Sequence, residues 1–130
     1  MAEQIVYSLS GSPVAWARAV PRKHHMWDSQ KNIKLLYGIA VAGQHVGEMY
    51  KGPLLLDVTF YFAMPKSRKR EWDKLRNTPH DIKPDNSNCI KLLEDAITGV
   101  LIHDDCIIAE IRAKKVWADE GKTIFTIVPL

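Results

Sequence analysis

The sequence has 130 residues, the length of one ordinary domain, and 46% of them are hydrophobic, enough to bury a core. No apolar run is long enough to cross a bilayer, and the N-terminal residues lack the basic-then-apolar layout of a signal peptide. Two cysteines make neither a disulfide framework nor a CxxC metal site, which favours a cytoplasmic protein. We therefore expect one domain over residues 1–130, without a membrane partner. The net charge is +3.

The first third of the chain predicts a strand, a loop and a helix. Residues 3–9 carry apolar side chains at alternate positions, which is typical of a strand. Residues 11–25 contain two prolines and scattered basic residues, and we expect a loop there. Helical spacing of apolar residues follows, with Asp28 or Ser29 as the candidate N-cap. The expected apolar stripe of this helix consists of Ile33, Leu36, Tyr37 and Ala40.

The remaining elements complete a mixed sheet. Residues 54–64 form the clearest strand, because apolar and polar side chains alternate along it. Residues 65–84 have little apolar periodicity and indicate a long loop, which in a compact domain is usually functional or mobile. A helix over residues 87–98 precedes a strand pair at 106–118 and 122–130. The order β-α-β-α-β-β predicts an α/β (α+β) fold, a small mixed β-sheet with two helices packed on it.

Basic side chains gather in two segments, both of which lie in expected loops. The first group consists of Arg18, Arg22 and Lys23, followed by two histidines. The second group consists of Lys66, Arg68, Lys69, Arg70, Lys74 and Arg76, against only two acids. Two such patches in one small domain indicate a polyanionic partner. Either patch alone would be explained equally well by a solvated loop.

Acidic side chains gather in the stretch KPDNSNCIKLLEDAITGVLIHDD, residues 83–105. Asp85 precedes the second helix, and a mixed sheet can bring it near Asp105, which enters the next strand. Carboxylates that meet on one side are costly unless a cation lies between them, and Mg²⁺ prefers such oxygen ligands. The alternative is that the acids decorate a solvated helix face and a turn. On spacing alone, this simpler alternative is the stronger one.

The same stretch is similar to the signature of the RusA family of Holliday-junction resolvases, roughly KPDxDNxxKxxxDAxxG followed closely by DD. The matching residues are Lys83, Pro84, Asp85, Asn88, Lys91, Asp95, Ala96, Gly99, Asp104 and Asp105. The early segment GSPVAWARAVPR resembles the Pro- and Arg-rich loop after the first strand of that family. The expected order of elements agrees with the family over nearly the whole chain.

The resemblance implies a homodimeric, Mg²⁺-dependent endonuclease, with Mn²⁺ as an alternative ion and no organic cofactor. Such enzymes nick two strands of a four-way DNA junction symmetrically in recombination and repair, and phages and prophages frequently encode them. The implied catalytic residues are Asp85, Asp105 and Lys91, of which the two acids bind the metal and Asp104 is a neighbouring candidate ligand. The two basic groups would then bind DNA phosphates near the branch.

One position departs from the family pattern. Ser87 stands where the signature has a metal-binding aspartate, and a hydroxyl is a neutral and weaker ligand. Glu94 shares the helix face of Ser87, about 10 Å further along the axis, and is a second candidate ligand. Two other interpretations therefore stay open. One is a module that binds branched DNA with weak or no cleavage, and the other is a nuclease that prefers flaps or replication forks.

Overall fold

The computed structural model describes residues 4–17, 20–22, 25–27 and 30–130. Its centre is a four-stranded mixed sheet in the order β1-β6-β4-β5. These strands are β1 (Tyr7–Ser10), β4 (Leu54–Ala63), β5 (Ile108–Ala118) and β6 (Lys122–Pro129). β4 pairs with β5 in parallel and with β6 antiparallel, and β1 pairs antiparallel with β6. The predicted mixed sheet is confirmed.

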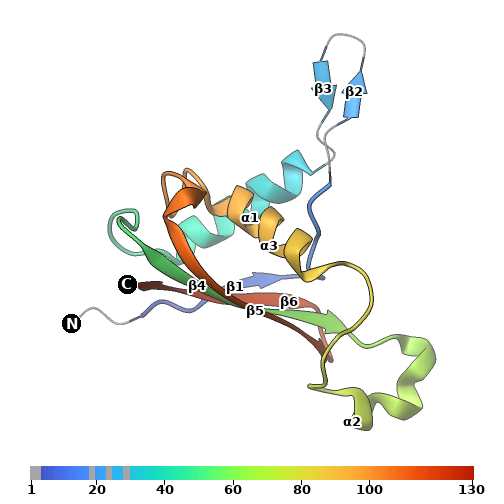
Figure 1. Ribbon diagram of the computed structural model, residues 1–130. Coiled ribbons are helices and arrows are strands. Elements are labelled where there is room, and N and C mark those ends of the chain that lie inside the picture. Colours follow the sequence, from blue (N-terminus) through green and yellow to red (C-terminus); the bar gives the residue numbers. More distant parts are fainter. Residues whose placement is uncertain (1–3, 18–19, 23–24, 28–29) are drawn as a thin grey trace.

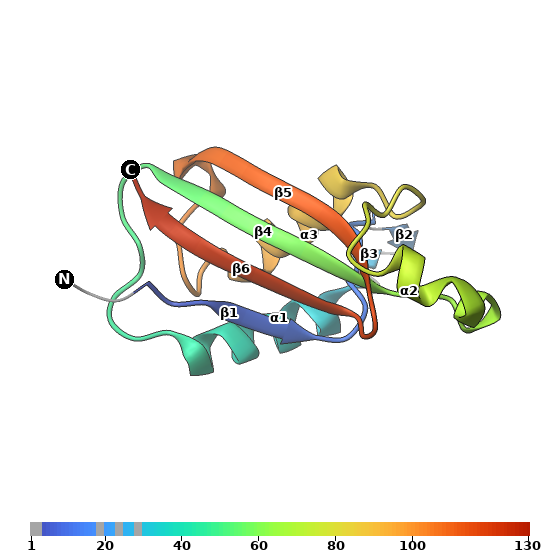
Figure 2. The ribbon, with the colours of Figure 1, turned by 90° about the horizontal axis from the view of Figure 1, so that it is seen from below.

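Two helices, α1 (Lys31–Gln44) and α3 (Asn86–Ile97), lie side by side on one face of this sheet (Figure 1). The opposite face is not covered by a helix layer (Figure 2). The core between helices and sheet is formed mainly by the alternate residues of β4, the inner face of α3, and β1 and β6. In the described part of the chain, no helix is long and apolar enough to span a membrane.

Local sequence explains the elements that hold the site. The alternation along β4 puts every second side chain, from Leu54 to Phe62, into the core. In α3 the buried residues recur at helical spacing, and Gly99, with a φ of +86°, follows its last turn in the left-handed region that glycine favours. One residue of the expected apolar stripe of α1 is wrong: Leu36 is 60% exposed, whereas Tyr37, as expected, and Val41 face the core.

Two short structured segments project from the domain: one stands above the helix layer near the start of α1, and the other lies beyond the end of β4 (Figure 1). The first is a hairpin of β2 (Val20–Arg22) and β3 (His25–Trp27), in a segment expected to be a loop. The second is the 3₁₀ helix η1 (Lys66–Glu71) followed by the one-turn helix α2 (Trp72–Leu75). Both are too short to produce an apolar repeat, so periodicity does not reveal them. The candidate cap residues Asp28 and Ser29 lie outside the described residues.

Candidate active site along helix α3

Asp85 occupies the N-cap position of α3, with its side chain about half exposed. It accepts a hydrogen bond from Lys83 Nζ at 2.8 Å. This bond and the positive charge of Lys83 lower the pKa of Asp85 below its ordinary value. The carboxylate at this end of the helix is therefore ionised, and a neighbouring cation already compensates its charge. Because Asp85 holds the N-cap, Ser87 lies inside the first turn and does not cap the helix.

Strand β5 fixes the segment that carries Asp85. Lys115 Nζ donates hydrogen bonds to the carbonyl oxygens of Ile82 and Pro84, each at 2.6 Å. Asn86 Nδ2 donates to the carbonyl oxygen of Ala113 at 3.2 Å. These contacts join residues about thirty positions apart, so no local sequence pattern indicates them. Lys115 is thus a supporting residue that the sequence interpretation missed.

Lys91 lies further along the exposed face of α3. Its ammonium group sits over the ring of Trp16, 3.6 Å from the ring centroid. The backbone N–H of Trp16 donates to the carbonyl oxygen of Asn88 at 2.9 Å, so the loop after β1 is attached to this turn of α3. Asp95, an alternative partner for Lys91, instead pairs with Lys34 of α1 at 3.5 Å. The signature lysine therefore points at an aromatic face rather than at an acid on its own helix.

Glu94, near the C-terminal end of α3, lies beside Asp105 in the short 3₁₀ helix η2 (Asp105–Ile107). Burial raises the pKa of Glu94 above its ordinary value, and the negative charges of Asp105 and Asp95 and a side-chain hydrogen bond with Asp105 raise it further. The charge of Lys91 opposes these effects and is the smallest cause. Two carboxyl groups are thus crowded together here.

Asp104 is the N-cap residue of η2, next to this pair. Its carboxylate accepts a hydrogen bond from the backbone N–H of Cys106 at 2.9 Å. Hydrogen bonds from Cys106, and then one with Asp105, lower the pKa of Asp104. Asp104 therefore stays ionised beside the crowded pair.

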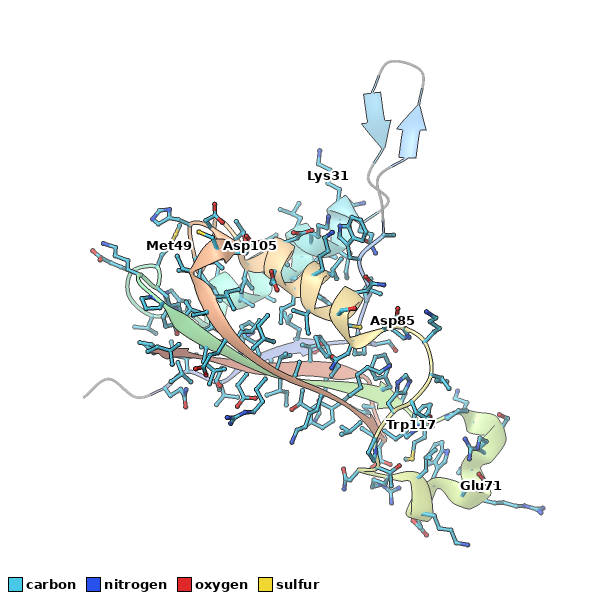
Figure 3. The ribbon with its side chains drawn as sticks, in the orientation of Figure 1. Lys31, Met49, Glu71, Asp85, Asp105 and Trp117 are labelled. Atoms are coloured by element: carbon cyan, nitrogen blue, oxygen red, sulfur yellow. The ribbon has the colours of Figure 1, made fainter. Side chains whose placement is uncertain are left out.

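The expected meeting of Asp85 and Asp105 does not occur within the single chain. Figure 3 shows the two residues at opposite ends of α3. The physical reason is the path of β5: Asn86, next to Asp85, bonds to Ala113 well inside the strand, whereas Asp105 precedes the start of the strand. In the described part of the chain, no group of three or more His, Cys, Asp or Glu side chains is placed to hold a metal ion.

The second basic segment is partly occupied by internal ion pairs. Arg68 pairs with Glu71 at 2.6 Å, and Arg76 pairs with Asp119 at 2.8 Å and with Asp73 at 3.1 Å. These two arginines hold the shape of the segment. Lys69 Nζ lies 5.9 Å from the ring centroid of Trp72. The other basic side chains of this segment, those of Lys66, Lys69, Arg70 and Lys74, are exposed and form no ion pair with an acid among the described residues.

Of the three basic residues of the first segment, the structure describes one. Arg22 is the last residue of β2, whereas Arg18 and Lys23 lie outside the described residues. In Figure 3, Asp85 lies between this hairpin and the helical segment that contains Glu71. Both predicted DNA-binding segments are therefore associated with the N-terminal end of α3. The end that carries Glu94 and Asp105 is the opposite one.

The model of the family described as "Endodeoxyribonuclease RusA" matches residues 11–128, nearly the whole chain. The chain belongs to the RusA family. The family resemblance expected from the stretch 83–105 is thereby confirmed, and with it membership of a family of endodeoxyribonucleases. The RusA-family chain is also 33% identical over 134 residues to the "Uncharacterized protein YqaN" of Bacillus subtilis (strain 168), with 91% of each chain covered.

Proposed function

We propose that this RusA-family protein is a Mg²⁺-dependent endonuclease that resolves four-way DNA junctions by paired, symmetric nicks during recombination and repair. The observation that carries the proposal is the arrangement along α3. Asp85 is its N-cap residue, Lys91 lies on its exposed face, and Asp105 lies in η2 beside Glu94 near its other end. The N-terminal end of α3 lies between two segments whose basic residues suit phosphate binding. Binding of this kind reads the shape of a branched DNA more than its sequence.

The donor set that best fits a divalent cation is the pair of Glu94 and Asp105, with Asp104 beside it. Burial is the main cause that raises the pKa of Glu94, and the negative charges of Asp105 and Asp95 raise it further, an effect that a cation would relieve. Mg²⁺ is commonly held by one or two carboxylates together with substrate phosphate oxygens, so two acids suffice without the aspartate missing at Ser87. When bound there, Mg²⁺ or Mn²⁺ would supply an activated water and stabilise charge at the scissile phosphate.

Lys91 and Asp85 take different parts in this proposal. Lys91 lies between the two ends of α3, and its ammonium group would offset negative charge on the phosphate. Asp85 is paired with Lys83, so it binds a metal only if that pair opens. In the closed pair, Asp85 orients Lys83 at the end of the molecule to which the basic segments belong. This makes Asp85 the family acid whose role most needs a direct test.

We propose a homodimer, because a two-fold dimer matches the symmetry of a four-way junction. α1 supplies a suitable surface: Leu35, Leu36 and Ile39 are each about 60% exposed. Lys31 lies in the first turn of α1, where its positive charge is unfavourable next to the positive end of the helix dipole. In an antiparallel dimer, the negative C-terminal end of the partner's α1 would lie near Lys31 and offset this effect. Ile39→Glu should give a monomer in sedimentation velocity and single rather than paired nicks. A variant that remains dimeric would rule this face out.

The test of the function uses a labelled mobile four-way junction, with Mg²⁺ or with EDTA. Paired, ligatable nicks that vanish in EDTA and in Asp105→Asn support the proposal, and equal cutting of linear duplex rules out a junction resolvase.

The second candidate is a module that binds branched DNA and cuts weakly, which Ser87 and the absence of a three-acid group among the described residues favour. Retention of the junction without nicks at any Mg²⁺ or Mn²⁺ concentration would establish it. Preferred cutting of flaps or forks would instead identify a nuclease of another specificity.

A further inference from the structure

Trp16 is held in place by its own backbone and by the residues on either side of it. The backbone N–H of Trp16 donates a hydrogen bond to the carbonyl oxygen of Asn88 in α3 at 2.9 Å. Gln30, the N-cap residue of α1 and only 9% exposed, accepts from the N–H of Ala17 at 2.7 Å and donates to the carbonyl oxygen of Ala15. An irregular loop is thereby fixed to both helices at the residue that carries the indole.

The ring of Trp16 meets the ammonium group of Lys91 at 3.6 Å from its centroid. Lys91 is exposed and has a flexible four-carbon stem, so it would otherwise sample many conformations. Two acids of the same helix are within its reach, because Glu94 and Asp95 follow it at i+3 and i+4. An ion pair with Glu94 would neutralise a carboxylate that the proposed metal site needs.

We infer that Trp16 is a positioning residue for Lys91, an inference that rests on the proposed nuclease function. The indole face holds the ammonium group beside the turn that contains Asn88, where it forms no ion pair with Glu94. Lys91 therefore stays available for a DNA phosphate, and Glu94 stays available for the cation.

A spectroscopic test addresses the contact without any activity. In protein labelled with ¹³C-lysine, the ε-CH₂ resonance of Lys91, assigned with Lys91→Met, should be shifted upfield by the ring current of Trp16. Trp16→Leu should abolish this shift, Trp16→Phe should retain part of it, and Trp72→Leu should leave it unchanged. A wild-type resonance at the ordinary lysine position would overturn the inference.

A kinetic test addresses the role. Under the proposed function, Trp16→Leu should lower kcat for junction cleavage roughly tenfold with little change in KM, and Trp16→Phe should restore most of it. If Trp16→Leu loses the upfield shift but keeps the wild-type kcat, Trp16 does not position Lys91 for the reaction. If the wild-type protein shows the shift but cuts no DNA, the proposed function fails and the positioning role with it. The contact itself then still stands.

Discussion

The two ends of α3 carry acids in opposite electrostatic situations. At the N-terminal end, Lys83 compensates Asp85 and lowers its pKa. At the C-terminal end, burial and the charge of Asp105 raise the pKa of Glu94. A compensated carboxylate gains little from a cation, whereas a crowded pair gains much. On this comparison we propose that the N-terminal end holds DNA and that the C-terminal end holds a metal ion.

The largest effect is expected from Asp105→Asn, which removes one of the two crowded carboxylates. Loss of this proposed metal ligand should cost several kcal/mol of transition-state stabilisation, so cleavage should fall on the order of a hundredfold or more. Junction affinity measured in EDTA should stay close to that of the wild type. Glu110→Gln, an exposed acid of β5, is the matched control and should cleave normally. An equal loss in both variants would show that this end of the helix has no special role.

Asp85→Asn tests at which end of α3 the cation binds. We expect it to reduce cleavage roughly tenfold while Mg²⁺ binding by the free protein, followed by calorimetry, is unchanged. The reason is that Asp85 contacts Lys83 and not the Glu94–Asp105 pair. If Asp85→Asn abolishes Mg²⁺ binding, the cation lies at the N-terminal end and the assignment of the two ends is reversed.

Lys69→Ala combined with Arg70→Ala tests the N-terminal end from the DNA side. Each lost phosphate contact should reduce the slope of log affinity against log salt by about 1, so the pair should reduce it by about 2. Lys51→Ala, an exposed lysine in the loop between α1 and β4, should leave the slope unchanged. Binding isotherms at several salt concentrations measure this. A slope that stays at the wild-type value would exclude the segment as a phosphate contact.

The sequence predicted those parts of the molecule in which one segment determines its own structure. The alternation along β4 and the helical signature around Lys91 are local patterns, and both elements formed where expected. The contact of Trp16 with Lys91 was not foreseen, because it depends on how a loop without periodicity packs. The separation of Asp85 from Asp105 follows from the register of α3 against β5, which no spacing within one segment encodes.

The smallest effect concerns stability and its dependence on pH. Because the pKa of Glu94 is raised by folding, the folded chain holds this proton more tightly than the unfolded chain. Stability should therefore fall as pH rises from the ordinary pKa of a glutamate to the raised value, and then level off. Glutamine does not ionise, so Glu94→Gln does not lose stability in this way. In EDTA, its thermal midpoint should exceed that of the wild type by a few degrees at neutral pH and match it in acid. Added Mg²⁺ should raise the wild-type midpoint but not that of Glu94→Gln, and a variant that responds to Mg²⁺ as the wild type does would remove Glu94 from the metal site.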